Sequence, residues 1–176
     1  MLARTMDERR RRFEAQALPH LDAAYNLARW LARSSSDADD IVQEAMLRAY
    51  KGIDGFHGTE IRPWLLAIVR NCYLTAARRN PKSRHVPLPE EGEVGPVLVS
   101  DELDPETAVI RADERQTLDA VIAALPEEFR EVLVLREIED CSYREIAEIT
   151  GAPIGTVMSR LSRARSLVKE RYRGLR

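Results

Sequence analysis

Apolar residues recur every three or four positions along most of this chain, which is the spacing of one face of an α-helix. The pattern breaks at glycine and proline and then resumes, so it divides the chain into a series of helical segments. These segments lie at 21–31, 41–50, 61–76, 118–125, 129–135, 146–149 and 157–168. No segment alternates apolar and polar residues in the way that a half-buried strand does. The pattern therefore predicts an all-α fold.

The helical pattern is interrupted in the middle of the chain. Asn80 precedes Pro81, and a residue before proline is pushed out of the helical conformation. The following residues are rich in proline, glycine and acids, which is typical of a flexible linker. A second helical block is predicted to begin near Asp104-Pro105-Glu106, where an N-cap residue precedes a proline. The predicted organisation is a helical bundle at 7–80, an acidic flexible linker at 81–104 and a second bundle at 105–176.

Each predicted bundle is small. Domains of about 60–70 residues hide only some 60% of the surface of their unfolded chain. We therefore expect both bundles to be modestly stable and inclined to dock on something larger. The sequence does not decide whether they pack against each other.

The last quarter of the chain carries the signals of a helix-turn-helix. Ser142 and Glu145 have the spacing of a capping box, which predicts a helix start. Gly151 suits the left-handed residue that ends such a helix, and Pro153 suits the first position of the next one. Two helices joined by a tight turn are the layout in which the second helix enters the major groove of DNA.

The second of these helices is strongly basic, although the whole chain has a net charge of −2. From residue 154 onward seven cations accompany one acid, whereas from 86 to 114 nine acids accompany one cation. Helical spacing places Val157, Leu161 and Ala164 on a buried stripe and puts hydroxyls and arginines on the opposite side and flanks. Small hydroxyls interleaved with arginines suit a DNA groove. The alternative is an amphipathic surface helix whose charges are solvated. The capping box, the glycine stop and the proline start occur at matching positions, and together they favour DNA binding.

A second candidate surface lies in the first bundle, on a helix that Ser36 is predicted to cap. This helix carries Asp37, Asp39, Asp40 and Glu44. Compensation of the helix dipole explains acids in the first turn. A surface for a basic partner explains them equally well, and periodicity leaves both interpretations open.

Phe56 lies in a glycine-bearing loop just before a helix with a basic C-terminal end. An aromatic residue beside such a helix end can receive an unstacked base. A loop aromatic is more often a simple anchor, and the residues alone leave both roles open.

Other function classes find little support. Cys72 and Cys141 are far apart and have no neighbours at metal-ligand spacing, so no metal site, no cofactor and no disulfide are predicted. Cys72 falls on an apolar helical stripe, which predicts a core thiol. The chain has no nucleophile with a spaced base and no phosphate-binding glycine loop, so we expect no enzymatic activity. Neither a secretory signal nor a membrane span is predicted, and we expect a soluble, cytoplasmic protein.

Two sets of motifs together are similar to the sigma factors of bacterial RNA polymerase. The stretch from Asp37 to Glu44, followed by Phe56, Gly58 and Trp64-Leu65-x-x-Ile68-x-x-Asn71, resembles sigma region 2. Leu125-Pro126-x-x-x-Arg130, Tyr143-x-Glu145-Ile146-Ala147 and Gly155 to Arg165 resemble region 4. The order of the regions and the absence of a middle domain resemble the extracytoplasmic-function (ECF) group.

The resemblance implies a sigma factor that binds core polymerase, recognises the −35 and −10 promoter elements and begins to melt the DNA. It implies contacts with the clamp helices and the flap of the polymerase, and an anti-sigma factor as a further partner. The implied −35 residues are Thr156, Ser159, Arg160, Ser162, Arg163 and Arg165. The implied −10 residues are Phe56, His57, Arg62, Trp64, Asn71, Thr75, Arg78 and Arg79. The implied core polymerase-binding residues are Asp37, Asp40, Gln43, Glu44, Leu47 and Arg48.

One residue departs from the family pattern: Met158 occupies a recognition-helix position that is often basic. The preferred −35 sequence therefore stays open. Two other functions fit the sequence less well. A sigma-like decoy that binds only an anti-sigma factor would not need Arg160, Arg163 and Arg165. An ordinary helix-turn-helix repressor would leave the block from Asp37 to Arg79 unexplained.

Overall fold

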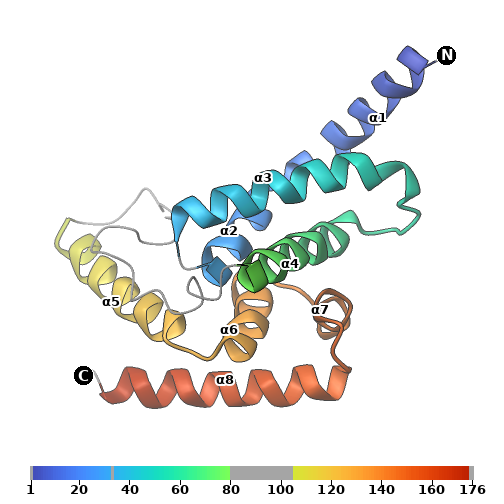
Figure 1. Ribbon diagram of the computed structural model, residues 1–176. Helices are drawn as coiled ribbons and strands as arrows, with labels where there is room; N and C mark the ends of the chain where they lie inside the picture. Colours follow the sequence, from blue (N-terminus) through green and yellow to red (C-terminus); the bar gives the residue numbers. More distant parts are fainter. Residues whose placement is uncertain (1, 33, 80–104, 175–176) are drawn as a thin grey trace.

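The computed structural model describes residues 2–32, 34–79 and 105–174. The predicted linker at 81–104 lies outside the described residues, and so does the predicted cap Asp104. Within the described ranges every regular element is helical, which confirms the predicted all-α fold (Figure 1). The N-terminal elements are α1 (Leu2–Gln16), η1 (Leu18–His20), α2 (Leu21–Ala32), α3 (Ser35–Gly52), η2 (Ile53–Gly55) and α4 (Ile61–Arg79). The C-terminal elements are α5 (Pro105–Ala123), α6 (Glu127–Leu133), η4 (Val134–Ile138), α7 (Tyr143–Thr150) and α8 (Ile154–Gly174).

The N-terminal bundle is formed by α2, α3 and α4, which pack against one another. Leu27, Ala45 and Leu65 are fully buried where these helices meet. Alanine is frequent at the contacts, as at Ala24 and Ala49, which lets the helix axes approach closely. The long, closely packed α3 and α4 thereby form a rigid support for the loop that joins them.

Helix boundaries follow the capping rules, with one correction. The predicted cap Ser36 is wrong, because α3 begins at Ser35 and its N-cap is Ser34. The Ser34 hydroxyl accepts a hydrogen bond from the Asp37 amide at 3.4 Å, which satisfies one of the unpaired amides of the first turn. Three serines in a row fit the rule equally well at the sequence level, so the spacing did not single out Ser34.

The predicted boundaries of the first helix of the helix-turn-helix are confirmed, whereas the predicted start of the second is one position too early. Ser142 and Glu145 form a reciprocal capping box at the start of α7, and Gly151 ends the helix with a φ of 68°. α8 begins at Ile154, directly after Pro153, so the proline lies one position before the helix.

The two bundles share one hydrophobic core. Leu135, Cys141 and Ile146 from the C-terminal bundle belong to the same buried cluster as Leu65 and Val69 of α4. Figure 1 shows α6 and α7 packed directly below α4, with α8 running beneath both. The two bundles therefore pack against each other, a point that the sequence leaves undecided.

α1 is a helix that the apolar pattern did not predict. It carries four consecutive arginines, and its last turns contact α3 and η2 while its first turns extend away from the body (Figure 1). Phe13 is its main apolar contact, and one such residue gives no periodicity. Across the described ranges, no helix combines the length and the apolar character that a bilayer crossing needs.

Candidate nucleic-acid and partner interfaces

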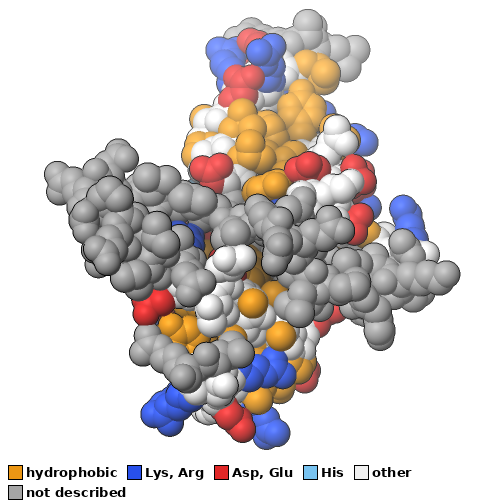
Figure 2. Space-filling view, turned by 90° about the vertical axis from the view of Figure 1, so that its left-hand side faces the viewer, with side chains coloured by type: hydrophobic (Ala, Val, Ile, Leu, Met, Phe, Trp, Pro, Cys, Tyr) orange, Lys and Arg blue, Asp and Glu red, His pale blue; other side chains and the backbone are white. Residues whose placement is uncertain are grey.

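The exposed side of α8 carries the residues predicted to meet DNA. Val157, Leu161 and Ala164 are fully or almost fully buried, as predicted, and they turn the opposite side of the helix outward. Ser159, Ser162 and Arg163 are exposed there, and Thr156 lies beside them, half-buried. Figure 2 shows basic side chains at the bottom of the molecule, where α8 lies. The exposed side of α8 is therefore open to a ligand.

Arg160 and Arg165 lie on the two flanks of α8, apart from the exposed row. The Arg160 guanidinium contacts the Glu128 carboxylate of α6 at 3.2 Å, and the Arg165 guanidinium contacts Glu137 of η4 at 2.7 Å. The Glu137 contact raises the pKa of Arg165 further above its ordinary value. DNA phosphates would have to compete with these carboxylates for the two arginines.

The motif residue Arg130 has a structural role in the C-terminal bundle. It is buried, and its Nη1 donates to the carbonyl oxygens of Ala123 and Leu125 at 3.1 Å and 2.9 Å. These carbonyls lie at the last residue of α5 and two residues after it, where helical partners are missing. Arg130 therefore fixes the turn between α5 and α6.

The predicted polymerase-binding residues lie along one side of α3. Asp40, Gln43, Glu44, Leu47 and Arg48 are exposed and Asp37 is half-buried, while Ile41 and Ala45 between them face the core. Leu47 is 52% exposed on this side of the helix. Arg48 is held by Glu44 of the preceding turn at 2.6 Å, a contact that raises the pKa of Arg48. This side of α3 presents acids around one apolar residue.

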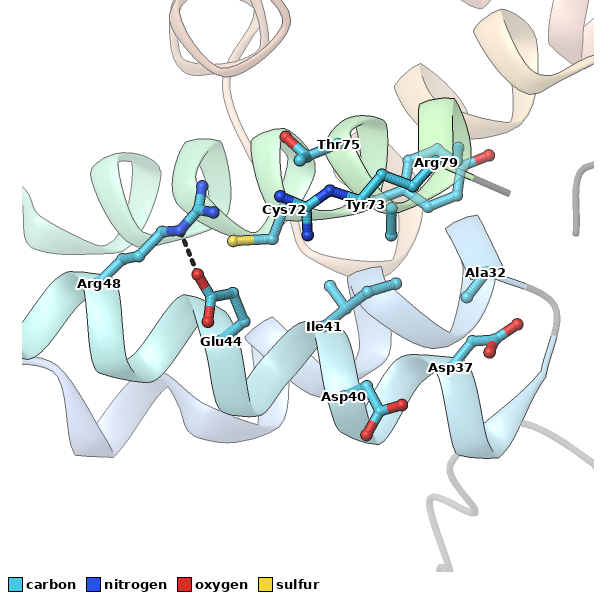
Figure 3. Close-up of a pocket in the computed structure, with 12 residues that line it drawn as sticks. Ala32, Asp37, Asp40, Ile41, Glu44, Arg48, Cys72, Tyr73, Thr75 and Arg79 are labelled. Carbon is cyan, nitrogen blue, oxygen red and sulfur yellow. Dashed lines mark hydrogen bonds and ion pairs between the residues drawn. The ribbon is translucent and has the colours of Figure 1, made fainter. Parts of the chain in front are cut away.

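A groove of about 350 Å³ joins this side of α3 to α4. Asp37, Asp40 and Glu44 line it from α3, and Thr75 and Arg79 line it from α4 (Figure 3). Figure 3 shows the Arg79 side chain reaching back along α4 into this groove. Residues predicted for the polymerase and for the −10 element therefore adjoin on a single surface, although no local spacing relates the two sets.

The loop between η2 and α4 is anchored by aromatic packing. The rings of Phe56 and Trp64 lie 5.0 Å apart between their centroids, and both side chains are half-buried. A Cβ at Gly58 would lie 2.8 Å from the Phe56 ring, so only glycine fits there without displacing it. His57 is exposed at the tip of the loop. Phe56 thus serves as an anchor in this arrangement, one of the two roles left open by the sequence.

The outer side of α4 gathers most of the predicted −10 residues. Asn71, Arg78 and Arg79 are exposed, and Thr75 is half-buried with its hydroxyl donating to the Asn71 carbonyl at 2.8 Å. Trp64 lies on the same side, two turns before Asn71. These residues form a polar and basic strip that leads from the loop to the end of α4.

Arg62 does not join that strip. It lies on the inner side of α4, where its guanidinium contacts the Glu139 carboxylate at 2.8 Å and the Cys141 sulfur at 3.7 Å. Glu139 is only 5% exposed and also accepts a hydrogen bond from Asn26 at 3.1 Å. Asp140, with a φ of 48°, turns the chain directly after Glu139. The predicted role of Arg62 at the −10 element stays a prediction, and it requires release from Glu139.

Two further polar contacts between the bundles were not recognised from the sequence. Arg70 of α4 pairs with the buried Glu131 of α6, and the Tyr73 hydroxyl donates to Glu127 at 2.8 Å. Burial raises the pKa of Glu131, against the opposing effect of Arg70. The partners are more than fifty residues apart, so no local spacing links them.

Neither cysteine is an activated thiol. Cys72 and Cys141 are both buried, which confirms the predicted core position of Cys72. Burial raises the pKa of Cys72, and it raises that of Cys141 to about 11. Both thiols therefore stay protonated at neutral pH.

Family models match both bundles of the chain. The model for sigma-70 region 2 matches residues 18–83, and the model for sigma-70 region 4 matches residues 115–168. The chain belongs to the ECF sigma factors. It is 37% identical over 147 residues to the ECF RNA polymerase sigma-E factor of Escherichia coli K12, covering 80% of this chain and 76% of that protein. It is 34% identical over 153 residues to the ECF sigma factor SigE of Mycolicibacterium smegmatis, covering 86% of this chain but only 58% of that protein.

Solved structures of related folds include both sigma domains. The sigma factor RpoE of Bartonella quintana, solved in complex with the anti-sigma factor NepR, matches with a TM-score of 0.71 and 27% identity. The match covers 92% of this chain and 96% of that one. CnrH in complex with the cytosolic domain of CnrY matches with a TM-score of 0.63, 24% identity and coverage of 96% and 92%, which shows a shared fold. Both matches extend over the two bundles of this ECF sigma factor.

Proposed function

We propose that this ECF sigma factor binds core RNA polymerase, recognises promoter DNA through both of its bundles and begins to melt it. The observation that carries the proposal is the exposed side of α8, where Ser159, Ser162 and Arg163 stand free of the core at the second helix of a capped helix-turn-helix. This is the geometry in which side chains reach base edges in the major groove. The ligand of α8 is the −35 element.

The N-terminal bundle serves the polymerase and the −10 element. Acidic residues around the exposed Leu47 on α3 suit a basic partner with an apolar contact, which we assign to the clamp helices of the polymerase. The strip on α4 ends in Arg78 and Arg79, which suit the phosphates of the −10 strand. Because both surfaces meet at the groove in Figure 3, DNA bound along α4 would lie against the polymerase.

In this structure the two bundles pack on one shared core, which we call the closed arrangement. A chain in the closed arrangement cannot reach both promoter elements. Elements centred near −35 and −10 lie about 25 base pairs apart, or about 85 Å of duplex. A compact chain of 176 residues has a radius of gyration of about 16 Å and is about 40 Å across. The residues at 81–104 could span up to about 80 Å if extended. Promoter binding therefore requires the bundles to separate, which also frees Arg62 from Glu139.

An anti-sigma factor is the partner that would keep the bundles together. The match to the NepR complex extends over 92% of this chain, so the placement of the two bundles resembles that of a sigma factor held by its inhibitor. The closed arrangement buries ion pairs of α4 with α6 and with the turn after η4. A partner that binds both bundles at once would stabilise this state by mass action.

The experiment uses the full chain bound to core polymerase and a promoter fragment recovered by run-off transcription. Arg163→Ala should weaken promoter binding and relax base preference at one −35 position by about 1–3 kcal/mol, as expected for loss of a bidentate contact with guanine. Arg173→Ala is the matched control, because Arg173 is also exposed on α8 but lies at its far end. An Arg163→Ala variant with unchanged base preference would contradict the assignment of α8 to the −35 element.

A further inference from the structure

The root of the loop at Phe56 is held by α1. Arg12 donates from Nη2 to the Phe56 carbonyl oxygen at 2.7 Å, in a partly buried contact between residues 44 positions apart. Its Nε donates to Gln16 at 3.2 Å, which orients the guanidinium. One turn earlier, Arg9 binds the carboxylate of Asp54 through two of its nitrogens. Two arginines of α1 thus bind the segment that leads into the loop.

Apolar packing docks α1 in the same place. Ala17 and Ile53 are fully buried in a small cluster with Ile61, and Phe13 packs against this cluster. Phe13 also contacts Tyr50 edge-on, with ring centroids 5.4 Å apart. Figure 1 shows α1 leaving the body beside α3 from this contact. The end of α1 that carries Arg9 and Arg12 is therefore held in place by apolar contacts.

The neighbouring arginines of α1 are engaged differently. Arg10 pairs with Glu14 and Arg11 pairs with Asp7, both within α1 and both exposed. Only Arg9 and Arg12 of the four reach across to the loop root. The helix also lies before residue 18, where the match to sigma region 2 begins. Arg11 therefore provides a control on the same helix.

We propose that Arg12 is a positioning residue for −10 recognition: through the Phe56 carbonyl it fixes the loop whose exposed residues, from His57 to Glu60, meet an unpaired base. This inference rests on the proposed function, because it takes the loop with Phe56 and His57 as the part of the −10 surface that meets the unpaired base. Arg12 holds the backbone from one side, while Trp64 and Gly58 enclose the Phe56 ring from the other. Because these contacts order the loop backbone before DNA binds, less conformational entropy is lost when a base is bound. Such preorganisation increases affinity and specificity.

The test measures base preference at each −10 position, using the full chain with core polymerase and a promoter fragment in which each −10 base is varied in turn. Arg12→Ala should reduce the preference at one −10 position about tenfold, since a hydrogen bond with a charged donor is lost. The preference at −35 should not change. Arg12→Lys keeps a charged donor and should recover most of the preference. Arg11→Ala, which removes the same charge from the same helix, should leave it unchanged.

A Phe56→Ala variant separates failure of this inference from failure of the loop's proposed role. Equal losses at the same position in Arg12→Ala, in Phe56→Ala and in the double variant would support a shared function. Loss in Phe56→Ala but not in Arg12→Ala would overturn the positioning role and leave the loop's role standing. No loss in Phe56→Ala would overturn both. A uniform loss at every promoter position in Arg12→Ala would show a general effect of charge or stability and would also overturn the inference. Thermal unfolding of each variant checks that it is folded.

Discussion

Replacing Arg62 with alanine should open the closed arrangement of the two bundles. The change leaves the Glu139 carboxylate, which is 5% exposed, with Asn26 as its remaining side-chain donor in this contact. Removing one partner of a buried ion pair costs about 3–5 kcal/mol, because the other charge stays buried without compensation. The Asn26 hydrogen bond places the expected cost near the lower figure, about 3 kcal/mol.

Separation of the bundles relieves this cost, because Glu139 then returns to water. A change of about 3 kcal/mol shifts the equilibrium between closed and separated forms roughly 150-fold. Small-angle X-ray scattering of the free chain measures the outcome. The radius of gyration should rise from about 16 Å toward about 25 Å, the value expected for two small domains on a linker of this length.

Arg144→Ala is the matched control, since the Arg144–Glu148 pair is largely exposed and should contribute less than about 1 kcal/mol. Adding Glu139→Gln to Arg62→Ala removes the buried charge and should restore part of the compaction. A radius of gyration and a melting temperature equal to those of the unchanged chain in Arg62→Ala would refute the reasoning. The ion pair would then contribute nothing to holding the bundles together.

Three further perturbations test separate parts of the structure. Gly58→Ala should lower the free energy of unfolding by about 1 kcal/mol in chemical denaturation, because the added Cβ would lie 2.8 Å from the Phe56 ring. The control Gly55→Ala should leave the free energy of unfolding unchanged, because a Cβ there meets no atom within 4 Å. Glu145→Ala should lower the free energy of unfolding by about 1 kcal/mol at pH 7, because the capping box is lost. The difference in unfolding free energy between the variant and the unchanged chain should become smaller as pH falls below 4.5. The sign follows because the hydrogen bond from the capping serine lowers the pKa of Glu145 in the folded state, so its stabilisation is present above the unfolded pKa and disappears as the carboxylate is protonated. Leu47→Asp should weaken binding to core polymerase at least tenfold in a pull-down titration while leaving the melting temperature within a few degrees, since Leu47 is 52% exposed.

Local features were the part of the fold that could be predicted from the sequence. The capping box of Ser142 and Glu145, the left-handed Gly151 and the buried stripe of α8 depend on spacings of one turn, which a sequence displays directly. The same reasoning failed at Ser36, because three adjacent serines satisfied the capping rule equally well and the cap is Ser34.

Contacts between distant residues could not be predicted in this way. The resemblance to sigma factors implied that Arg62 belongs with Trp64 to the −10 residues, yet two positions along a helix turn a side chain to the opposite face. Its partner Glu139 lies 77 residues away. Likewise Arg12 belonged to a run of arginines with no apolar period, and only the docking of α1 places its guanidinium at the Phe56 carbonyl.

Run-off transcription with purified core polymerase on a pool of genomic promoter fragments tests the function of this ECF sigma factor most directly. Specific transcripts should begin only when the chain is added, and their start sites should share −10 and −35 sequences. A stable complex with core polymerase that initiates no transcripts would instead indicate a decoy. Binding to duplex DNA without any complex with the polymerase would contradict the proposed function and favour a repressor.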